Sequence, residues 1–383
     1  MVGQARVTGY AESPVGRLEG TSTDDLASAM VIEATRSAGL GLGQLDGLVV
    51  CSPLVGGRPR QSLALAESLG TAASLRYFDT VSLSGASALA GVLDAFALVE
   101  SGTCSAVAVV AADTPRTGQR RSESVSAFAA MRHPSWEQPL GMMNVSAYAL
   151  LASSYLSRHK LSPDALCVLP VLMRQHAHRT PGAAYRNPLT ADDVARSRVV
   201  SSPLRLLECA PVSDGAGAVV VTGGRLGRAG ACEVALRSGA RAAHYDNVSF
   251  AGDMTTTGCV AAGRAALDDS GVALDSIDVA LLYDSYSITL AIELEELGFC
   301  PPGTAARWVA EGGGGMSSPA PVNPHGGLLS HAHCGGAAGM HHVVEAIKQL
   351  SGRADNQVRG ARRALLHAEG GILSAHCTAV LDG

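Results

Sequence analysis

Residues 34–52 read ATRSAGLGLGQLDGLVVCS, and residues 266–284, offset by 232 positions, read ALDDSGVALDSIDVALLYD without a gap. Each stretch has the pattern of a helix tail, a glycine stop at Gly39 or Gly271, a short connection and an apolar strand. Because self-similarity at this distance indicates duplication, we expect two copies of one structural unit.

A second pair of stretches supports the duplication. Residues 85–102 read GASALAGVLDAFALVESG, and residues 335–352 read GGAAGMHHVVEAIKQLSG. Both begin with a glycine-rich turn, continue as a helix and end in Ser-Gly, and each leads toward an apolar strand, at 106–111 and 364–366. A weaker pair predicts glycine-initiated strands at 215–221 and 370–381.

The repeats divide the chain into two similar halves, residues 1–225 and 226–383. Alternating strand and helix patterns predict an α/β fold with a mixed, mostly parallel sheet covered by helices. Residues 114–200 form an insertion that begins polar and irregular and then becomes helical at 145–159 and 163–178. An insertion of this length is typical of a lid or a substrate-binding region.

Composition excludes several classes of protein. The 383 residues carry 29 Lys and Arg against 34 Asp and Glu, with no basic run, which argues against nucleic-acid binding. The start of the chain lacks the apolar stretch of a signal peptide, and no apolar run reaches the roughly 18 residues of a membrane span. The nine cysteines are scattered and form no Cys-x-x-Cys pair. We therefore expect a cytoplasmic protein with free thiols and no membrane span.

Several motifs resemble the thiolase superfamily over essentially the whole chain. They are the opening strand and turn at 7–16, the segment 209–221, Tyr-Asp-Ser-Tyr at 283–286, Leu-Glu-Glu-Leu-Gly-Phe-Cys at 294–300 and Asn-Pro-His-Gly-Gly-Leu-Leu-Ser-His-Ala-His at 323–333. The pattern is most similar to sterol-carrier-protein-type thiolases and to the thiolase-like aldolases that shorten steroid side chains. The resemblance implies a thiolase-like fold, with two duplicated βαβαβαββ halves and a helical insertion, in a homodimer.

The family's nucleophile is missing. Gly85 lies 17 residues before Gly102, the spacing at which thiolases carry their reactive cysteine before the glycine that closes its helix. An acyl-enzyme requires a thiolate there, and glycine cannot supply one. The family's second cysteine is also replaced, and His367 stands at its place. The resemblance therefore implies a pocket that binds an acyl thioester and stabilises an enolate without a thiol.

Four residues are candidate catalysts by this resemblance. His333 matches an oxyanion-hole histidine that faces the thioester carbonyl, and Tyr283 matches a tyrosine that handles the proton of a β-hydroxyl group. His331 stands where the aldolases carry a second tyrosine and is a candidate proton shuttle. His367 is a candidate acid or base, with a packed core histidine as the alternative.

Five residues are candidates for substrate binding: Gly85, Ser87, Asp284, Asn323 and Gly371. For Ser87 and Asp284, helix capping is the competing interpretation. The run of His325, His331, His333 and Cys334 also suggests a metal, but it lies among glycine-rich turns with no nearby carboxylate, so we expect no metal site.

We expect a carbon–carbon lyase, a retro-aldolase or aldolase, that acts on a β-hydroxyacyl thioester of coenzyme A. Beyond CoA as part of the substrate, no cofactor is expected. The resemblance implies a small partner protein with a zinc ribbon and an OB-fold. Two alternatives remain open: an acyltransferase or Claisen-type enzyme with a relocated nucleophile such as Cys334, and a non-catalytic acyl-thioester-binding subunit of a complex.

Overall fold

The computed structural model describes residues 4–224, 226, 232–254 and 256–383. The first sheet has the order β1-β7-β4-β2-β3. In it β2 is parallel to β3 and β4, whereas β7 is antiparallel to β1 and β4. The strands are β1 (Arg6–Glu12), β2 (Gly47–Cys51), β3 (Tyr77–Val81), β4 (Ala106–Asp113) and β7 (Gly215–Thr222).

The second sheet repeats four strands of the first in the same order, β8-β11-β10-β9. Its strands are β8 (Ala235–Ala243), β9 (Val279–Leu282), β10 (Arg363–Gly370) and β11 (Ala375–Asp382). Within the described residues it has no strand equivalent to β3; beside β9 there is only a single parallel bridge from Ala280 to Val322. The duplication is confirmed. The strand predicted to begin at Gly370 begins at Ala375, after a turn.

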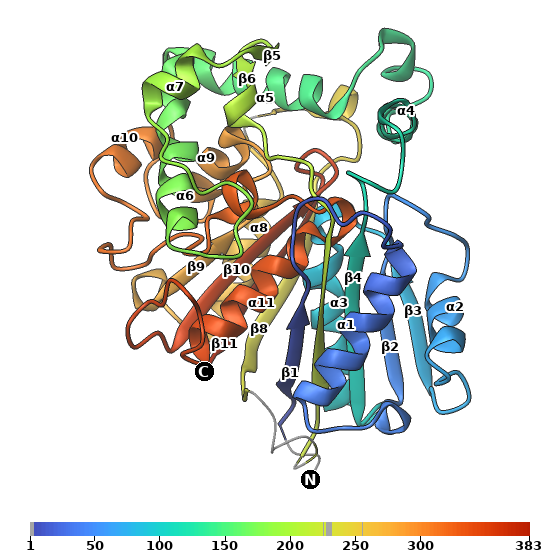
Figure 1. Cartoon of the computed structure of the whole chain (residues 1–383). Coiled ribbons are helices and arrows are strands. Elements are labelled where there is room, and N and C mark those ends of the chain that lie inside the picture. The colour runs from blue at the N-terminus through green and yellow to red at the C-terminus, as the bar shows by residue number, and fades with distance from the viewer. Residues whose placement is uncertain (1–3, 225, 227–231, 255) are drawn as a thin grey trace.

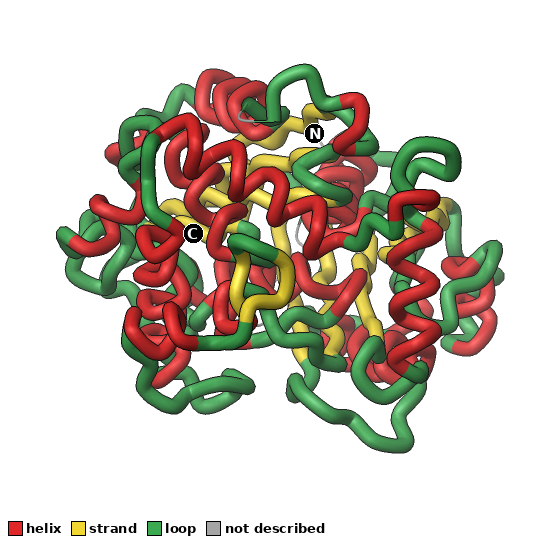
Figure 2. The backbone as a smooth tube through the Cα atoms, turned by 90° about the horizontal axis from the view of Figure 1, so that it is seen from above, coloured by secondary structure: helices red, strands yellow, loops and turns green. Residues whose placement is uncertain are grey.

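Helices cover both sheets and also fill the space between them (Figure 1). α1 packs on the outer face of the first sheet, α8 packs on the outer face of the second, and α3 and α11 contact both sheets from within. Seen from above, the strands lie inside a surround of helices and loops (Figure 2). The helices of the two halves are α1 (Thr23–Ser37), α2 (Gln61–Ser68), α3 (Ser87–Glu100), α8 (Cys259–Ser270), α9 (Ser287–Glu296), α10 (Ala305–Ala310) and α11 (Ala338–Leu350).

The two central helices begin alike, each after one turn of 3-10 helix, at Ser84–Ala86 and Gly335–Ala337. They approach closely because small residues line their contact. A β carbon at Gly339 would lie 2.5 Å from the carbonyl oxygen of Gly85. The glycine-rich starts predicted from the sequence therefore place both helix N-termini side by side, at the end of the molecule where the parallel strands finish.

The insertion forms the helical part above that end, drawn in green in Figure 1. It contains α4 (Arg121–Ala130), α5 (Asn144–His159), α6 (Val168–His178) and α7 (Ala191–Arg196), followed by the small hairpin of β5 (Val199–Ser201) and β6 (Leu204–Arg205). The two helices predicted in it are confirmed. The predicted boundary between the halves falls at residue 225, outside the described residues. No helix in the described part of the chain is long and apolar enough to cross a membrane.

Candidate active site

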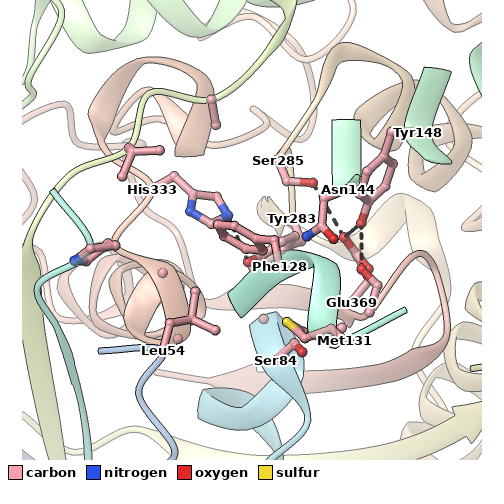
Figure 3. Close-up of a pocket in the computed structure, with 18 of the residues that line it drawn as sticks. Leu54, Ser84, Phe128, Met131, Asn144, Tyr148, Tyr283, Ser285, His333 and Glu369 are labelled. Atoms are coloured by element: carbon pink, nitrogen blue, oxygen red, sulfur yellow. Dashed lines mark hydrogen bonds between the residues drawn. The ribbon is translucent and has the colours of Figure 1, made fainter. Parts of the chain in front are cut away.

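A cavity of about 420 Å³ opens at the carboxyl ends of the parallel strands. Residues that directly follow β2, β4 and β9, and the last residues of β10, all reach it. Ligands of open α/β sheets bind at this edge because the loops there diverge. The insertion closes the other side with apolar side chains, including Phe128, Met131, Met143 and Val145. Figure 3 shows ten of the lining residues by name.

Gly85 and Tyr283 meet at the bottom of this cavity, and both line it. A β carbon built at position 85 would overlap Cζ and Oη of Tyr283, at less than 3.0 Å, and would lie 2.5 Å from the carbonyl oxygen of Glu369. Any side chain at position 85 would therefore displace the Tyr283 ring. The tyrosine takes the space into which a cysteine at the start of α3 would project.

Tyr283 and His333 lie next to each other in the lining of the cavity (Figure 3), with Oη and Nε2 3.4 Å apart. Tyr283 directly follows β9, and His333 lies on the loop before α11. Burial and the charge of Glu369 raise the pKa of Tyr283 well above 10, and burial lowers the pKa of His333 to about 4. At neutral pH the phenol is therefore protonated and the imidazole is neutral.

A second polar group in the cavity centres on Glu369, near the end of β10. Its Oε1 accepts hydrogen bonds from Tyr148 Oη at 2.5 Å and Ser285 Oγ at 3.4 Å, and its Oε2 accepts one from the Leu373 amide at 3.1 Å. The carboxylate is 1% exposed, and burial raises its pKa to about 7. We did not predict Glu369, Tyr148 or Ser285 from the sequence.

Asn144, the first residue of α5, also reaches the cavity. Its Oδ1 is buried and has no hydrogen-bond partner among the described residues. A buried acceptor without a partner costs free energy unless a donor reaches it. We did not predict this residue from the sequence either, because asparagine is common at the start of a helix and does not by itself indicate a site.

His331, the candidate proton shuttle, does not line the cavity. It ends a π-helical turn at Gly327–His331 and faces a histidine cluster formed by His325, His331, His341 and His342. The cluster is buried, and seven of its ring nitrogens lack hydrogen-bond partners among the described residues. Burial, with the neighbouring His341, lowers the pKa of His331 to about 3. Burial also lowers the pKa values of His325 and His342, so these two and His331 are neutral at pH 7.

His367, on β10, also lies away from the cavity, buried on the face of the second sheet that carries α8. Its Nδ1 is 2.7 Å from Thr378 Oγ1, and its Nε2 is 3.1 Å from His376 Nδ1. Cys259 joins the two histidines in the one group of described residues with metal-ligand spacing. His376 Nε2 lies 3.0 Å from the Leu373 carbonyl oxygen, so one set of neutral tautomers satisfies every ring nitrogen without an ion. His367 corresponds to the packed core histidine of our alternative interpretation.

The expected substrate-binding residues divide into two sets. Gly85 and Gly371 line the cavity. Ser87, Asp284 and Asn323 do not line it, and their side chains form hydrogen bonds within the protein. Ser87 Oγ accepts a hydrogen bond from the Leu83 amide, and the Asp284 carboxylate accepts from the Leu328 and Leu329 amides. Asn323 accepts from the Leu282 amide and donates to the Asp284 carboxylate. They shape the loops that carry Tyr283 and His333.

None of the nine cysteines lines the cavity. Cys334, next to His333, is fully buried, and burial raises the pKa of its thiol well above 9. A nucleophile must reach the substrate as a thiolate. The position of Cys334 therefore disfavours the relocated nucleophile that an acyltransferase would need.

The two related sheets, the paired central helices and a thiol-free cavity at their N-termini define an enzyme of the thiolase fold. Residues 240–383 match the family described as "Thiolase C-terminal domain-like". The solved structure named "Ltp2-ChsH2(DUF35) aldolase" superposes with a TM-score of 0.87 at 26% identity, over 99% of this chain and 98% of that one. Human mitochondrial 3-ketoacyl-CoA thiolase, at 12% identity, shares the fold with a TM-score of 0.76 over 100% of this chain and 99% of its own.

Two relatives that align over almost the whole chain indicate which kind of thiolase-fold enzyme this is. The 17-hydroxy-3-oxo-4-pregnene-20-carboxyl-CoA lyase of Mycobacterium tuberculosis is 29% identical over 97% of both chains. The steroid side-chain-cleaving aldolase of Thermomonospora curvata is 28% identical over 97% of this chain and 96% of its own. The chain is a thiolase-like aldolase, a carbon–carbon lyase. This favours the aldolase over both the acyltransferase and the non-catalytic subunit.

Proposed function

We propose that this aldolase cleaves the bond between the α and β carbons of a β-hydroxyacyl-CoA, or forms it in the reverse direction. The observation that carries the proposal is the position of the Tyr283 hydroxyl group, which fills the space in front of Gly85. A protonated phenol there can stabilise an enolate, whereas no cysteine reaches the cavity to form an acyl-enzyme.

Tyr283 and His333 would act on the thioester oxygen. As the α–β bond breaks, its electron pair moves into an enolate and negative charge develops on that oxygen. The protonated phenol of Tyr283 donates to it, and His333, as the Nε2–H tautomer, donates to the phenol oxygen 3.4 Å away. The earlier expectation that Tyr283 takes the β-hydroxyl proton stays a prediction. Its raised pKa means that the phenol would need a further base to do so.

The lining of the cavity supports a bulky apolar acyl group. Phe128 and Met131 from the insertion, with Leu54 after β2, face the polar groups across the cavity (Figure 3). One relative is named a steroid side-chain-cleaving aldolase, and another a 17-hydroxy-3-oxo-4-pregnene-20-carboxyl-CoA lyase. We therefore propose a polycyclic or similarly large β-hydroxyacyl-CoA whose β carbon carries the leaving ketone, with CoA as part of the substrate and no other cofactor.

Assembly and location are proposals of the same kind. The similar structure named "Ltp2-ChsH2(DUF35) aldolase" supports a complex with a second protein, and we propose a small zinc-ribbon and OB-fold partner together with a homodimer of this chain. A cytoplasmic location remains our expectation.

The test is product analysis with purified protein, alone and with its co-purified partner. A steroid β-hydroxyacyl-CoA with a tertiary hydroxyl group should yield a ketone and a shortened acyl-CoA, in equal amounts. Thiolysis of a 3-ketoacyl-CoA by free CoA should be at background. The opposite pattern, thiolysis without cleavage of the hydroxyacyl thioester, would show that the proposal is wrong.

A further inference from the structure

The retro-aldol reaction moves one proton from the β-hydroxyl oxygen to the α carbon, and the pair of Tyr283 and His333 does not provide a ready base for it. Tyr283 is held protonated, and burial gives His333 a pKa of about 4. A base works best when its pKa lies near the working pH. A further group in the cavity must therefore carry the proton.

We propose that Glu369 is the general base that takes the β-hydroxyl proton and returns it to the α carbon, and that Tyr148 positions its carboxylate. This proposal rests on the proposed function. It goes beyond it because it names the group that moves the proton.

The hydrogen bonds around Glu369 favour its ionised form, whereas burial opposes ionisation and leaves its pKa at about 7. All three partners, Tyr148, Ser285 and the Leu373 amide, donate or can donate to the carboxylate. A backbone amide can only donate, and a protonated acid would have to redirect one hydroxyl group. Among the described residues, Oε2 accepts one hydrogen bond, from the Leu373 amide. Its second lone pair can therefore accept a proton from the substrate.

The position of Glu369 suits the reacting atoms. Its backbone carbonyl lies where the start of α3 and the Tyr283 hydroxyl meet, and its side chain faces the same cavity from β10 (Figure 3). Tyr283 lines the same cavity, and the charge of Glu369 contributes to its raised pKa. The proposal places the thioester oxygen at Tyr283 and the α and β carbons toward Glu369.

The step balances without another reactant. Glu369 accepts the proton of the β-hydroxyl group, the O–H electron pair becomes the second bond of the ketone, and the α–β bond breaks. Its electrons form the enolate, whose oxygen Tyr283 stabilises. Glu369 then gives the same proton to the α carbon, which regenerates the thioester and the carboxylate.

The titratable groups that face Glu369 all have pKa values above their ordinary values. Tyr148 on α5, Tyr245, and Tyr283 and Tyr286 beside β9 all have raised pKa values, and so does Glu293 on α9. The tyrosines are therefore protonated at neutral pH. Because the Tyr148 hydrogen bond lowers the pKa of Glu369, its removal should raise that pKa.

The first experiment measures turnover of Glu369→Gln on the steroid β-hydroxyacyl-CoA. We expect kcat to fall by roughly 100-fold or more with little change in KM. Glu345→Gln is the matched control, because Glu345 is also buried, with a pKa raised to about 7, but does not line the cavity. Thermal unfolding checks that both variants are folded. Equal turnover of Glu369→Gln and wild type would overturn the proposal.

The second experiment tests Tyr148. In wild type, kcat/KM should rise with pH and level off above about pH 7, where Glu369 is ionised. Tyr148→Phe should move this rise to higher pH, which a loss of packing alone would not do. An unshifted profile would contradict the positioning role.

A third readout separates the inference from the proposed function. In D₂O the protein should exchange the α-protons of propionyl-CoA, and Glu369→Gln should lose this exchange. Exchange that depends on Glu369, without cleavage of any hydroxyacyl thioester, would reject the retro-aldol function and keep the base. Cleavage that persists in Glu369→Gln would reject the base and keep the function.

Discussion

The Tyr283 hydroxyl group occupies the space that a β carbon at Gly85 would fill, so a side chain at position 85 and the Tyr283 ring cannot both fit there. The absence of a side chain at position 85 and the presence of a tyrosine after β9 are therefore sterically linked. The space before α3 holds a phenol hydroxyl group, which can stabilise an oxygen anion.

Gly85→Ala tests this exclusion. The added methyl group must push the Tyr283 ring away, so we expect a loss of roughly 1–3 kcal/mol of stability, together with most of the turnover. Gly43→Ala is the control, because a β carbon there meets nothing within 4 Å. Turnover and thermal unfolding measure both effects. If Gly85→Ala were as active and as stable as Gly43→Ala, the two residues would not compete for this space.

Tyr283→Phe should lower turnover by roughly 100-fold or more, because it removes the hydroxyl group that faces the reacting oxygen. Binding of the product acyl-CoA should change little. Tyr155→Phe is a matched control: it also removes a buried tyrosine hydroxyl group, bonded to Glu295, but outside the cavity. Near-normal turnover of Tyr283→Phe would remove the phenol from the mechanism.

Cys334→Ala should leave turnover within a few-fold of wild type, since the thiol is buried outside the cavity and its pKa is raised. The measurement is steady-state cleavage of the β-hydroxyacyl-CoA. A loss as large as that of Tyr283→Phe, in a folded variant, would restore Cys334 as a candidate nucleophile.

His331→Leu should keep turnover and change the dependence of stability on pH. The pKa of His331 is about 3 in the folded protein and about 6.5 when unfolded, so protons bind preferentially to the unfolded chain between these values. Wild type should therefore lose stability relative to the variant as pH falls from about 6.5, by about 1.4 kcal/mol per pH unit at most. Denaturant unfolding at pH 7.5, 6 and 5 measures the difference.

A difference that stays constant with pH would mean that His331 is already solvated or charged. The groups that face it are His325, His341, Glu12 and Lys348. Loss of turnover in a stable His331→Leu variant would instead support the catalytic role that the sequence suggested.

The sequence predicted what local patterns and the duplication determine. The repeats predicted the strand that ends just before Tyr283 and the glycine-rich starts of α3 and α11. The resemblance to thiolases pointed to Gly85 and His333. The fold repeats these units in space as it does in sequence, so their meeting point at the cavity was predictable.

The polar group at Glu369 was not predictable, because it depends on contacts between distant segments. Tyr148 on α5 and Glu369 on β10 are 221 residues apart in the sequence and meet through a hydrogen bond between their side chains. His367 and Glu369 lie on the same face of β10, two residues apart. Glu369 is nearer the end of the strand and lines the cavity, whereas His367 lies within the core. The π-helical turn at Gly327–His331 turns His331 away from His333, which a regular strand would have placed on the same side.

The most direct measurement of the central claim is the intact mass of the enzyme during turnover, recorded with the products. Under saturating steroid β-hydroxyacyl-CoA, the account predicts an unmodified enzyme mass at every time point, while ketone and shortened acyl-CoA accumulate together. A transient mass increase equal to the acyl group, on a peptide containing a cysteine, would contradict it.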